Sequence, residues 1–207
     1  MFLFDLDGTL LDSNGVWIDV DRTFLARRNM EYSKAYYEGV AHTIFPLAAV
    51  FTKDFCQLEE SCEEIMAEWM DLAKDAYAHV QLKPHVKDYL DQCKANGESM
   101  AIVTAAIPIH CQTALDHLGI AHYFDRITYA QELGLDKKKP DIWLLAAKDA
   151  GVSPADCTVF DDSFAACHGA KSAGMTTIGV YDEMFKSDTE KLRASCDRFI
   201  LGFGELL

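Results

Sequence analysis

The chain has 207 residues, half of them hydrophobic, and its 33 acidic and 19 basic side chains give a net charge of -14. This length predicts one large core, or one core that carries an inserted module. The acidic balance excludes nucleic acid and anionic membranes as favourable partners, because both are polyanions. The sequence has neither a signal-like start nor an apolar run of about eighteen residues, so we expect a cytoplasmic protein.

The cysteines indicate the same compartment. They are seven in number, and no two of them form a Cys-x-x-Cys pair. In a chain of this length the pattern predicts reduced, mostly buried thiols, and neither a disulfide framework nor a zinc site. These residues are Cys56, Cys62, Cys93, Cys111, Cys157, Cys167 and Cys196.

The first element along the chain is an apolar run at residues 1–4 that ends at two carboxylates, Asp5 and Asp7. A short apolar run is typical of a buried strand in a parallel sheet, and open sheets of this kind bind ligands where their strands end. Gly8 allows a sharp turn and leaves backbone N–H groups free to face an anion such as phosphate. Taken alone, the motif fits two acidic caps of an ordinary turn equally well.

A helical block follows. From about residue 16 to residue 77 apolar side chains recur at helical spacing, as in Trp17, Val20 and Phe24, and almost no strand pattern is present. The strand at residues 1–4 has no possible sheet partner before Ser99. We therefore predict an all-helical domain at residues 15–81, inserted into a core made of residues 1–14 and 82–207.

Beyond residue 84 helices and strands alternate. Such alternation predicts an α/β fold, with a Rossmann-like parallel sheet that has helices on both faces. Glycines end several of the helices. The predicted helices are 84–96, 109–118, 141–150, 164–173 and 187–194, and the predicted strands after the first are 99–103, 126–130, 157–160, 176–180 and 198–200.

Four polar segments fall at the ends of successive strands or just before a helix, on the edge where such a sheet binds ligands. In their order and spacing they resemble the haloacid dehalogenase superfamily of hydrolases. The resemblance is to subfamily I, in the branch of phosphoglycolate phosphatases and β-phosphoglucomutases, whose core carries an inserted helical cap. It covers nearly the whole chain. The segments are Asp5-x-Asp7, Thr104, the run 137–141 that opens with three lysines, and Asp161-Asp162.

The resemblance implies a role for each carboxylate. Asp5 is expected to attack phosphorus and form an aspartyl-phosphate, while Asp7 protonates the leaving oxygen and later deprotonates the attacking water. A Mg²⁺ ion is expected to be bound by Asp5, the backbone carbonyl of Asp7, Asp162, and Asp161 directly or through water. Without a cation, the adjacent charges of Asp161 and Asp162 would be costly.

The phosphate is expected to be held by the Thr104 hydroxyl, the backbone N–H of Ala105 and the ammonium of Lys137. The family pattern places its lysine four residues before the Asp that opens the next helix, which selects Lys137. This chain has Lys138 where a proline is usual, so Lys138 stays an alternative. A run of lysines is also common in solvated loops, and a lone threonine at a strand end is commonly a local cap.

These expectations favour a Mg²⁺-dependent phosphatase that hydrolyses a small soluble phosphate monoester, with the helical cap excluding bulk water. A phosphomutase of the β-phosphoglucomutase type is the nearest alternative. Such mutases carry a cap histidine soon after the first motif, whereas the first histidine of this chain is His42. A catalytically silent phosphate-binding regulator is the third possibility. The expected partner is a small phosphate ester, and no oligomeric state is predicted.

Overall fold

The computed structural model describes residues 1–40 and 45–207, so His42 lies outside the described residues. The chain divides into two compact units. Unit 1 holds residues 1–14 and 80–207, and unit 2 holds residues 15–79. Within the described residues, no helix has the length and apolar character needed to cross a membrane.

Unit 1 is built on a six-stranded sheet whose strands all run parallel to their neighbours, in the order β3-β2-β1-β4-β5-β6. This arrangement confirms the predicted α/β fold. The first strand lies in the middle, paired with β2 and β4, because its apolar residues can be buried on both faces there. The strands are β1 (Phe2–Phe4), β2 (Met100–Thr104), β3 (Arg126–Tyr129), β4 (Thr158–Asp161), β5 (Thr176–Val180) and β6 (Arg198–Ile200).

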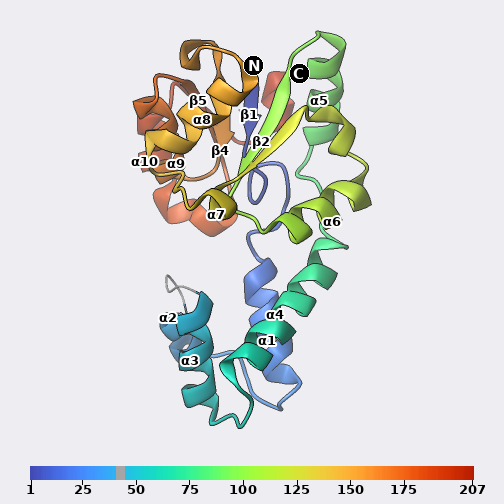
Figure 1. Cartoon of the computed structure of the whole chain (residues 1–207), viewed down its shortest axis with the longest axis vertical. Coiled ribbons are helices and arrows are strands. Elements are labelled where there is room, and N and C mark those ends of the chain that lie inside the picture. Colours follow the sequence, from blue (N-terminus) through green and yellow to red (C-terminus); the bar gives the residue numbers. More distant parts are fainter. Residues whose placement is uncertain (41–44) are drawn as a thin grey trace. The chain divides into compact units, whose positions relative to one another are not determined.

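Helices cover both faces of this sheet. Figure 1 shows α8 and α9 on one side of β1 and α5 on the other side. The α-helices of unit 1 are α5 (Val86–Ala95), α6 (Pro108–Leu118), α7 (Ala130–Leu133), α8 (Pro140–Ala150), α9 (Phe164–Ser172) and α10 (Thr189–Ser195). The short 3₁₀ helices are η1 (Ala121–Tyr123), η2 (Pro154–Asp156), η3 (Glu183–Asp188) and η4 (Phe203–Leu206).

The alternation of side chains along β1 supplies the core on each face. Leu3 points into a cluster that includes Val159 of β4 and Trp143 of α8, all fully buried. Phe4 points the other way and stacks on Phe160, with ring centroids 4.6 Å apart. Burial of a side chain of this size stabilises the fold by about 1.5–3 kcal/mol. The two cores together fix the strand that carries the first carboxylate.

A tight loop follows β1. The backbone N–H groups of Leu10 and Leu11 donate to the Leu6 carbonyl at 3.0 and 2.9 Å, and Gly8 has a φ of +76°. A side chain at Gly8 would overlap those of Asn14 and Asp162, because an added Cβ would lie 2.0 and 2.2 Å from their atoms. Glycine is therefore required here by its conformation and by the close approach of neighbours.

Unit 2 consists of helices in its described part. The longest, α4, begins at a capping box in which Ser61 accepts from the Glu64 backbone N–H, while the Glu64 carboxylate accepts from that of Ser61. Its buried face includes Ile65 and Trp69, and Trp69 packs on Phe24 with ring centroids 5.6 Å apart. The helices are α1 (Val16–Ala26), α2 (Lys34–Val40), α3 (Phe45–Cys56) and α4 (Cys62–Tyr77).

Some predicted boundaries were wrong. The helix predicted at 84–96 begins only at Val86, because His85 adopts a left-handed conformation with a φ of 64° that a helix cannot include. The strand predicted to reach Ala130 ends at Tyr129, and α7 begins at Ala130 instead. Four residues are too few to display helical periodicity. The helix predicted at 187–194 is α10, displaced to Thr189–Ser195 behind η3.

Candidate active site

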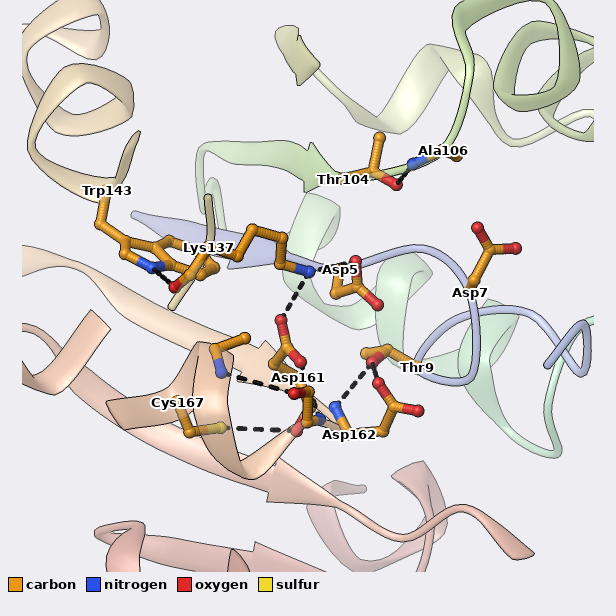
Figure 2. Close-up of polar contacts among 12 residues, drawn as sticks. Asp5, Asp7, Thr9, Thr104, Ala106, Lys137, Trp143, Asp161, Asp162 and Cys167 are labelled. Atoms are coloured by element: carbon orange, nitrogen blue, oxygen red, sulfur yellow. Dashed lines mark hydrogen bonds and ion pairs between the residues drawn. The ribbon is translucent and has the colours of Figure 1, made fainter. Parts of the chain in front are cut away.

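The carboxyl ends of the central strands bring three carboxylates together. Asp5 directly follows β1, Asp161 ends β4, and Asp162 follows it. One oxygen from each of the three lies within 4.8 Å of the other two, and all three residues are buried. Figure 2 shows them gathered beside Lys137. The sequence predicted this grouping because parallel strands end at a common edge.

Lys137 is the cation of this group. Its Nζ contacts Asp5 Oδ1 and lies 2.7 Å from Asp161 Oδ2, with only 11% of the side chain exposed. Burial alone would lower the pKa of Lys137, but the adjacent charges of Asp161 and Asp5 outweigh it and raise the pKa above its usual value. The side chain therefore stays an ammonium ion. It bridges the ends of β1 and β4.

The loop that carries Lys137 is held from two sides. Trp143 of α8 donates its indole N–H to the Lys137 carbonyl at 2.8 Å, and its ring centroid lies 5.8 Å from Lys137 Nζ. Gly169 of α9 packs so closely that an added Cβ would lie 2.2 Å from the same carbonyl oxygen. Lys138 and Lys139 are exposed. The structure thus places Lys137, and not the alternative Lys138, beside the carboxylates.

The two adjacent carboxylates have different surroundings. Asp162 Oδ2 accepts a hydrogen bond from the Asn14 side-chain amide at 2.7 Å, and Thr9 Oγ1 lies 3.4 Å from Asp162 Oδ1. The Thr9 hydroxyl oxygen also accepts from the Asp162 backbone N–H at 3.1 Å. Asp161 Oδ1 accepts from the Ser163 backbone N–H at 2.8 Å. Asp161 Oδ2 faces Lys137 as an ion pair without an aligned hydrogen bond from any described residue.

The pKa values report the crowding of negative charge. Burial raises the pKa of Asp161 to about 6, against the opposing charge of Lys137 and with the help of Asp5. Burial, together with the charges of Asp5 and Asp161, raises the pKa of Asp162 well above its ordinary value. Three buried carboxylates and one ammonium leave an excess of negative charge, which favours binding of a further cation.

Asp7 and Thr104 lie at the same edge in different settings. Asp7 is half-buried, its Oδ1 accepts a hydrogen bond from the Ser13 hydroxyl at 2.5 Å, and its side chain points away from Lys137 (Figure 2). Thr104 ends β2 and is fully buried, and its hydroxyl oxygen accepts from the Ala106 backbone N–H at 2.9 Å. Ala105, which lies between Thr104 and Ala106, is exposed. The three-carboxylate group does not include the Asp7 side chain.

Sequence reasoning missed several residues that organise this edge. Thr9 and Asn14 hold Asp162 by the contacts given above, and Lys83 holds the loop after β1. Lys83 Nζ donates to the carbonyls of Gly8 and Tyr181, the second at 2.7 Å, and pairs with Asp182 Oδ2 at 2.7 Å. Thr9 belongs to the first motif, which is a usable signal. Lys83 has no such signal, because its partners lie 75 to 99 residues away.

The group could hold a metal ion. Its donors are carboxylate oxygens, the ligands that a hard cation such as Mg²⁺ prefers, and Asp161 Oδ2 lacks an aligned hydrogen-bond donor among the described residues. The group also has an excess of negative charge, which a bound cation would neutralise. Asp5, Asp161 and Asp162 are therefore suited to hold a divalent cation.

A model of the haloacid dehalogenase-like hydrolase family matches residues 2–180. The chain is 27% identical to the fructose-1-phosphate phosphatase YqaB of Escherichia coli over 186 residues, which cover 86% of this chain and 94% of the relative. It is 28% identical to a Pseudomonas putida phosphoglycolate phosphatase over 189 residues, which cover 87% and 68%. Among solved structures, a putative β-phosphoglucomutase from Thermotoga maritima has the same fold, with a TM-score of 0.85, 21% identity and coverage of 96% and 93%.

Proposed function

The chain belongs to the haloacid dehalogenase-like hydrolase family, and we propose that it is a Mg²⁺-dependent phosphatase of a small phosphate monoester. The observation that carries the proposal is the buried group of Asp5, Asp161 and Asp162, bridged by Lys137. Relatives of similar length are named as phosphatases of phosphorylated small molecules, which supports the same substrate class. The proposed reaction needs a nucleophile, a general acid and base, and groups that bind the phosphate.

Asp5 is the proposed nucleophile. Its carboxylate lies at the end of a buried strand, and the contact with Lys137 fixes one oxygen, so that the side chain has little freedom to rotate. Attack by a carboxylate oxygen forms a P–O bond to Asp5 while the bond from phosphorus to the leaving oxygen breaks. A held nucleophile needs less ordering in the transition state, which lowers the barrier. The product of this step is an aspartyl-phosphate.

Asp7 is the proposed acid and base. In the first step it gives its proton to the leaving alkoxide, and in the second step it takes a proton from the water that attacks the aspartyl-phosphate. The second step breaks the P–O bond to Asp5 and releases inorganic phosphate. The hydrogen bond from the Ser13 hydroxyl orients the Asp7 carboxyl group for this transfer. A half-buried position suits a group that must meet both substrate and water.

The remaining groups neutralise and hold the phosphate. Lys137 supplies an ammonium charge, and we assign the Thr104 hydroxyl and the Ala105 backbone N–H as donors to phosphate oxygens. The Thr104 hydroxyl oxygen accepts from Ala106, and a hydroxyl group can donate its own hydrogen at the same time. When bound, Mg²⁺ supplies the Lewis acid charge that lets two anions approach each other. Asp5, Asp161, Asp162 and the carbonyl of Asp7 would hold it.

A phosphate-release screen over phosphorylated metabolites tests this function. With Mg²⁺ present, we expect release of inorganic phosphate from at least one small monoester, and we expect chelation of the metal to abolish it. Controls are the same panel without protein and with a variant that lacks Asp5. If a hexose phosphate is isomerised without net phosphate release, the chain is a mutase. If no ester reacts and phosphate still binds, it is a regulator.

The acidic group also predicts how stability depends on pH and metal. The pKa of Asp161 is about 6 in the folded chain and 3.8 ordinarily, so between these values the folded state binds more protons than the unfolded state. The free energy of unfolding of the metal-free protein should then fall as pH rises through this window, by about 3 kcal/mol for this group. Asp162 acts in the same direction. Added Mg²⁺ should restore stability at about pH 7.5 and do little at about pH 5, where protons compete with the metal.

Urea unfolding at both pH values, with and without Mg²⁺, measures these free energies. Asp162→Asn should raise the stability of the metal-free protein at neutral pH and remove most of the stabilisation by Mg²⁺, because it deletes one charge and one ligand. Asp71→Asn is the matched control, since Asp71 is exposed. An equal response of the two variants to Mg²⁺ would show that the metal does not bind at this group.

A further inference from the structure

Two thiols meet on the face of the sheet that α9 covers. Cys167 lies in α9 and is buried, while Cys196 follows the last residue of α10 and is half-buried. The helices α9 and α10 pack against each other, and α9 also packs on β4 and β5. The side chains of Cys167 and Cys196 interact with each other, which raises the pKa of Cys167 and lowers that of Cys196. By contrast, Cys93 and Cys111 interact with tyrosine side chains.

Both sulfurs lie against one pair of strand residues. Asp161 of β4 is paired with Gly179 of β5 in the parallel sheet. Cys167 Sγ donates to the Asp161 carbonyl oxygen at 3.6 Å, a contact drawn in Figure 2. A Cβ added to Gly179 would lie 3.1 Å from Cys196 Sγ, so the absence of a side chain at Gly179 provides the space for this sulfur. The position of each thiol is thus fixed by the same strand pair, directly behind a carboxylate of the site.

We propose that Cys167 and Cys196 are a thiol–disulfide site, oxidised by a hydroperoxide and reversed by thiols. The inference goes beyond the phosphatase function and does not require it. Disulfide geometry needs Cβ atoms about 3.5–4.5 Å apart, and the two sulfurs lie against paired residues of adjacent strands, Asp161 and Gly179. The partly exposed Cys196 is where an oxidant in solvent can enter.

The chemistry balances as a two-electron oxidation. The thiolate of Cys196 attacks one peroxide oxygen, the O–O bond breaks, and a sulfenic acid and hydroxide result. The sulfur of Cys167 then attacks Cys196 Sγ, the S–O bond breaks, and the thiol proton leaves with hydroxide as water. The sum is two thiols and hydrogen peroxide giving one disulfide and two waters. The thiolate is the species that attacks the peroxide, and the interaction with Cys167 outweighs burial and lowers the pKa of Cys196.

The bond would act on the candidate site through α9. Oxidation removes the S–H that Cys167 donates to the Asp161 carbonyl and ties α9 to the end of α10. The same helix carries Gly169, which packs against the backbone of Lys137. A displacement of α9 therefore shifts two of the charged groups at once. Misplacement of reacting groups by about 1 Å can lower a rate on the order of a hundredfold, so we expect the disulfide to reduce turnover.

Peptide mapping after peroxide treatment tests the proposal. Trypsin should release residues 149–171, which hold Cys157 and Cys167, and residues 194–198, which hold Cys196. We expect these two peptides to be linked through Cys167, with the loss of two hydrogens, and to separate on addition of dithiothreitol. Fragment ions distinguish Cys167 from Cys157. Cys196→Ser should abolish the link, whereas Cys62→Ser is the matched control and should keep it.

Two results would overturn the proposal. One is a link that joins Cys157 to Cys196, and the other is oxidation of Cys196 to sulfinic acid in the full chain with no linked peptide. Folding of Cys196→Ser is checked by its circular dichroism and its unfolding transition. Because the primary readout is a peptide mass, failure of the disulfide and failure of the phosphatase function are separate results. Where hydrolysis is measurable, peroxide should slow the native chain and spare Cys196→Ser.

Discussion

Replacement of Asp5 by Asn is expected to abolish turnover of a generic aryl phosphate. The amide is nearly the same size, but it is a poor nucleophile and cannot carry the phosphoryl group to the second step. The expected loss in kcat is on the order of 10⁶-fold, as when the covalent nucleophile of a serine protease is removed. The measurement is initial-rate phosphate release at saturating substrate and Mg²⁺.

Two further observations separate a chemical role of Asp5 from a structural one. Circular dichroism and the unfolding transition establish that Asp5→Asn is folded, and Asp71→Asn serves as an exposed control of the same chemistry. Native crystals soaked with Mg²⁺ and beryllium fluoride should contain a phosphoryl mimic attached to the Asp5 carboxylate. Turnover by Asp5→Asn near the native rate, or an active crystal with no mimic beside Asp5, would remove this residue as the nucleophile.

The edge of the sheet on which the candidate site lies could be predicted from the sequence, because the ends of the strands are enough to define it. Asp5, Thr104 and Asp161 each occur where an apolar run stops, and the carboxyl ends of parallel strands share one edge whatever the strand order. The prediction that these residues share one edge did not require the central position of β1. Fold class and the grouping of carboxylates therefore follow from local patterns joined by one general property of parallel sheets.

The contacts behind the carboxylates could not be predicted in the same way. Lys83 binds the Gly8 carbonyl and Asp182, and Asn14 binds Asp162 across 148 residues of sequence. Such pairs depend on which loops meet in three dimensions, and no local periodicity encodes this. The left-handed conformation of His85 was missed for a related reason, since glycine or asparagine is the usual signal for it.

The choice between Lys137 and Lys138 required the packing of the loop. Spacing to the next helix favoured Lys137 as the phosphate-binding lysine. Because Lys138 stands where the family usually has a proline, Lys138 remained an alternative. In the structure, the contacts of Trp143 and Gly169 with the Lys137 carbonyl fix the backbone so that the Lys137 side chain enters the carboxylate group. The neighbouring Lys138 is then exposed. This difference in burial predicts that substitutions at Lys137 and Lys138 have different effects on the rate.

Lys137→Met is expected to lower kcat by about 10²- to 10³-fold, the usual cost of removing one preorganised donor that stabilises the transition state. Lys138→Met is the matched control and should stay within severalfold of the native rate, because its side chain is solvated. Lys137→Met also leaves the buried carboxylate of Asp161 without its ion-pair partner. Loss of one member of a buried pair costs about 3–5 kcal/mol at neutral pH.

The loss of rate and the loss of stability in Lys137→Met can be measured separately. Protonation of Asp161 removes the uncompensated charge, so the stability lost in Lys137→Met should be smaller at about pH 5 than at about pH 7.5. Rates are compared under conditions in which circular dichroism shows both variants folded. Because Mg²⁺ neutralises the same carboxylates, it should recover part of the stability of Lys137→Met. The ion cannot replace an ammonium group on the phosphate, so the rate should stay low. A larger loss of activity in Lys138→Met than in Lys137→Met would instead assign the phosphate-binding charge to Lys138.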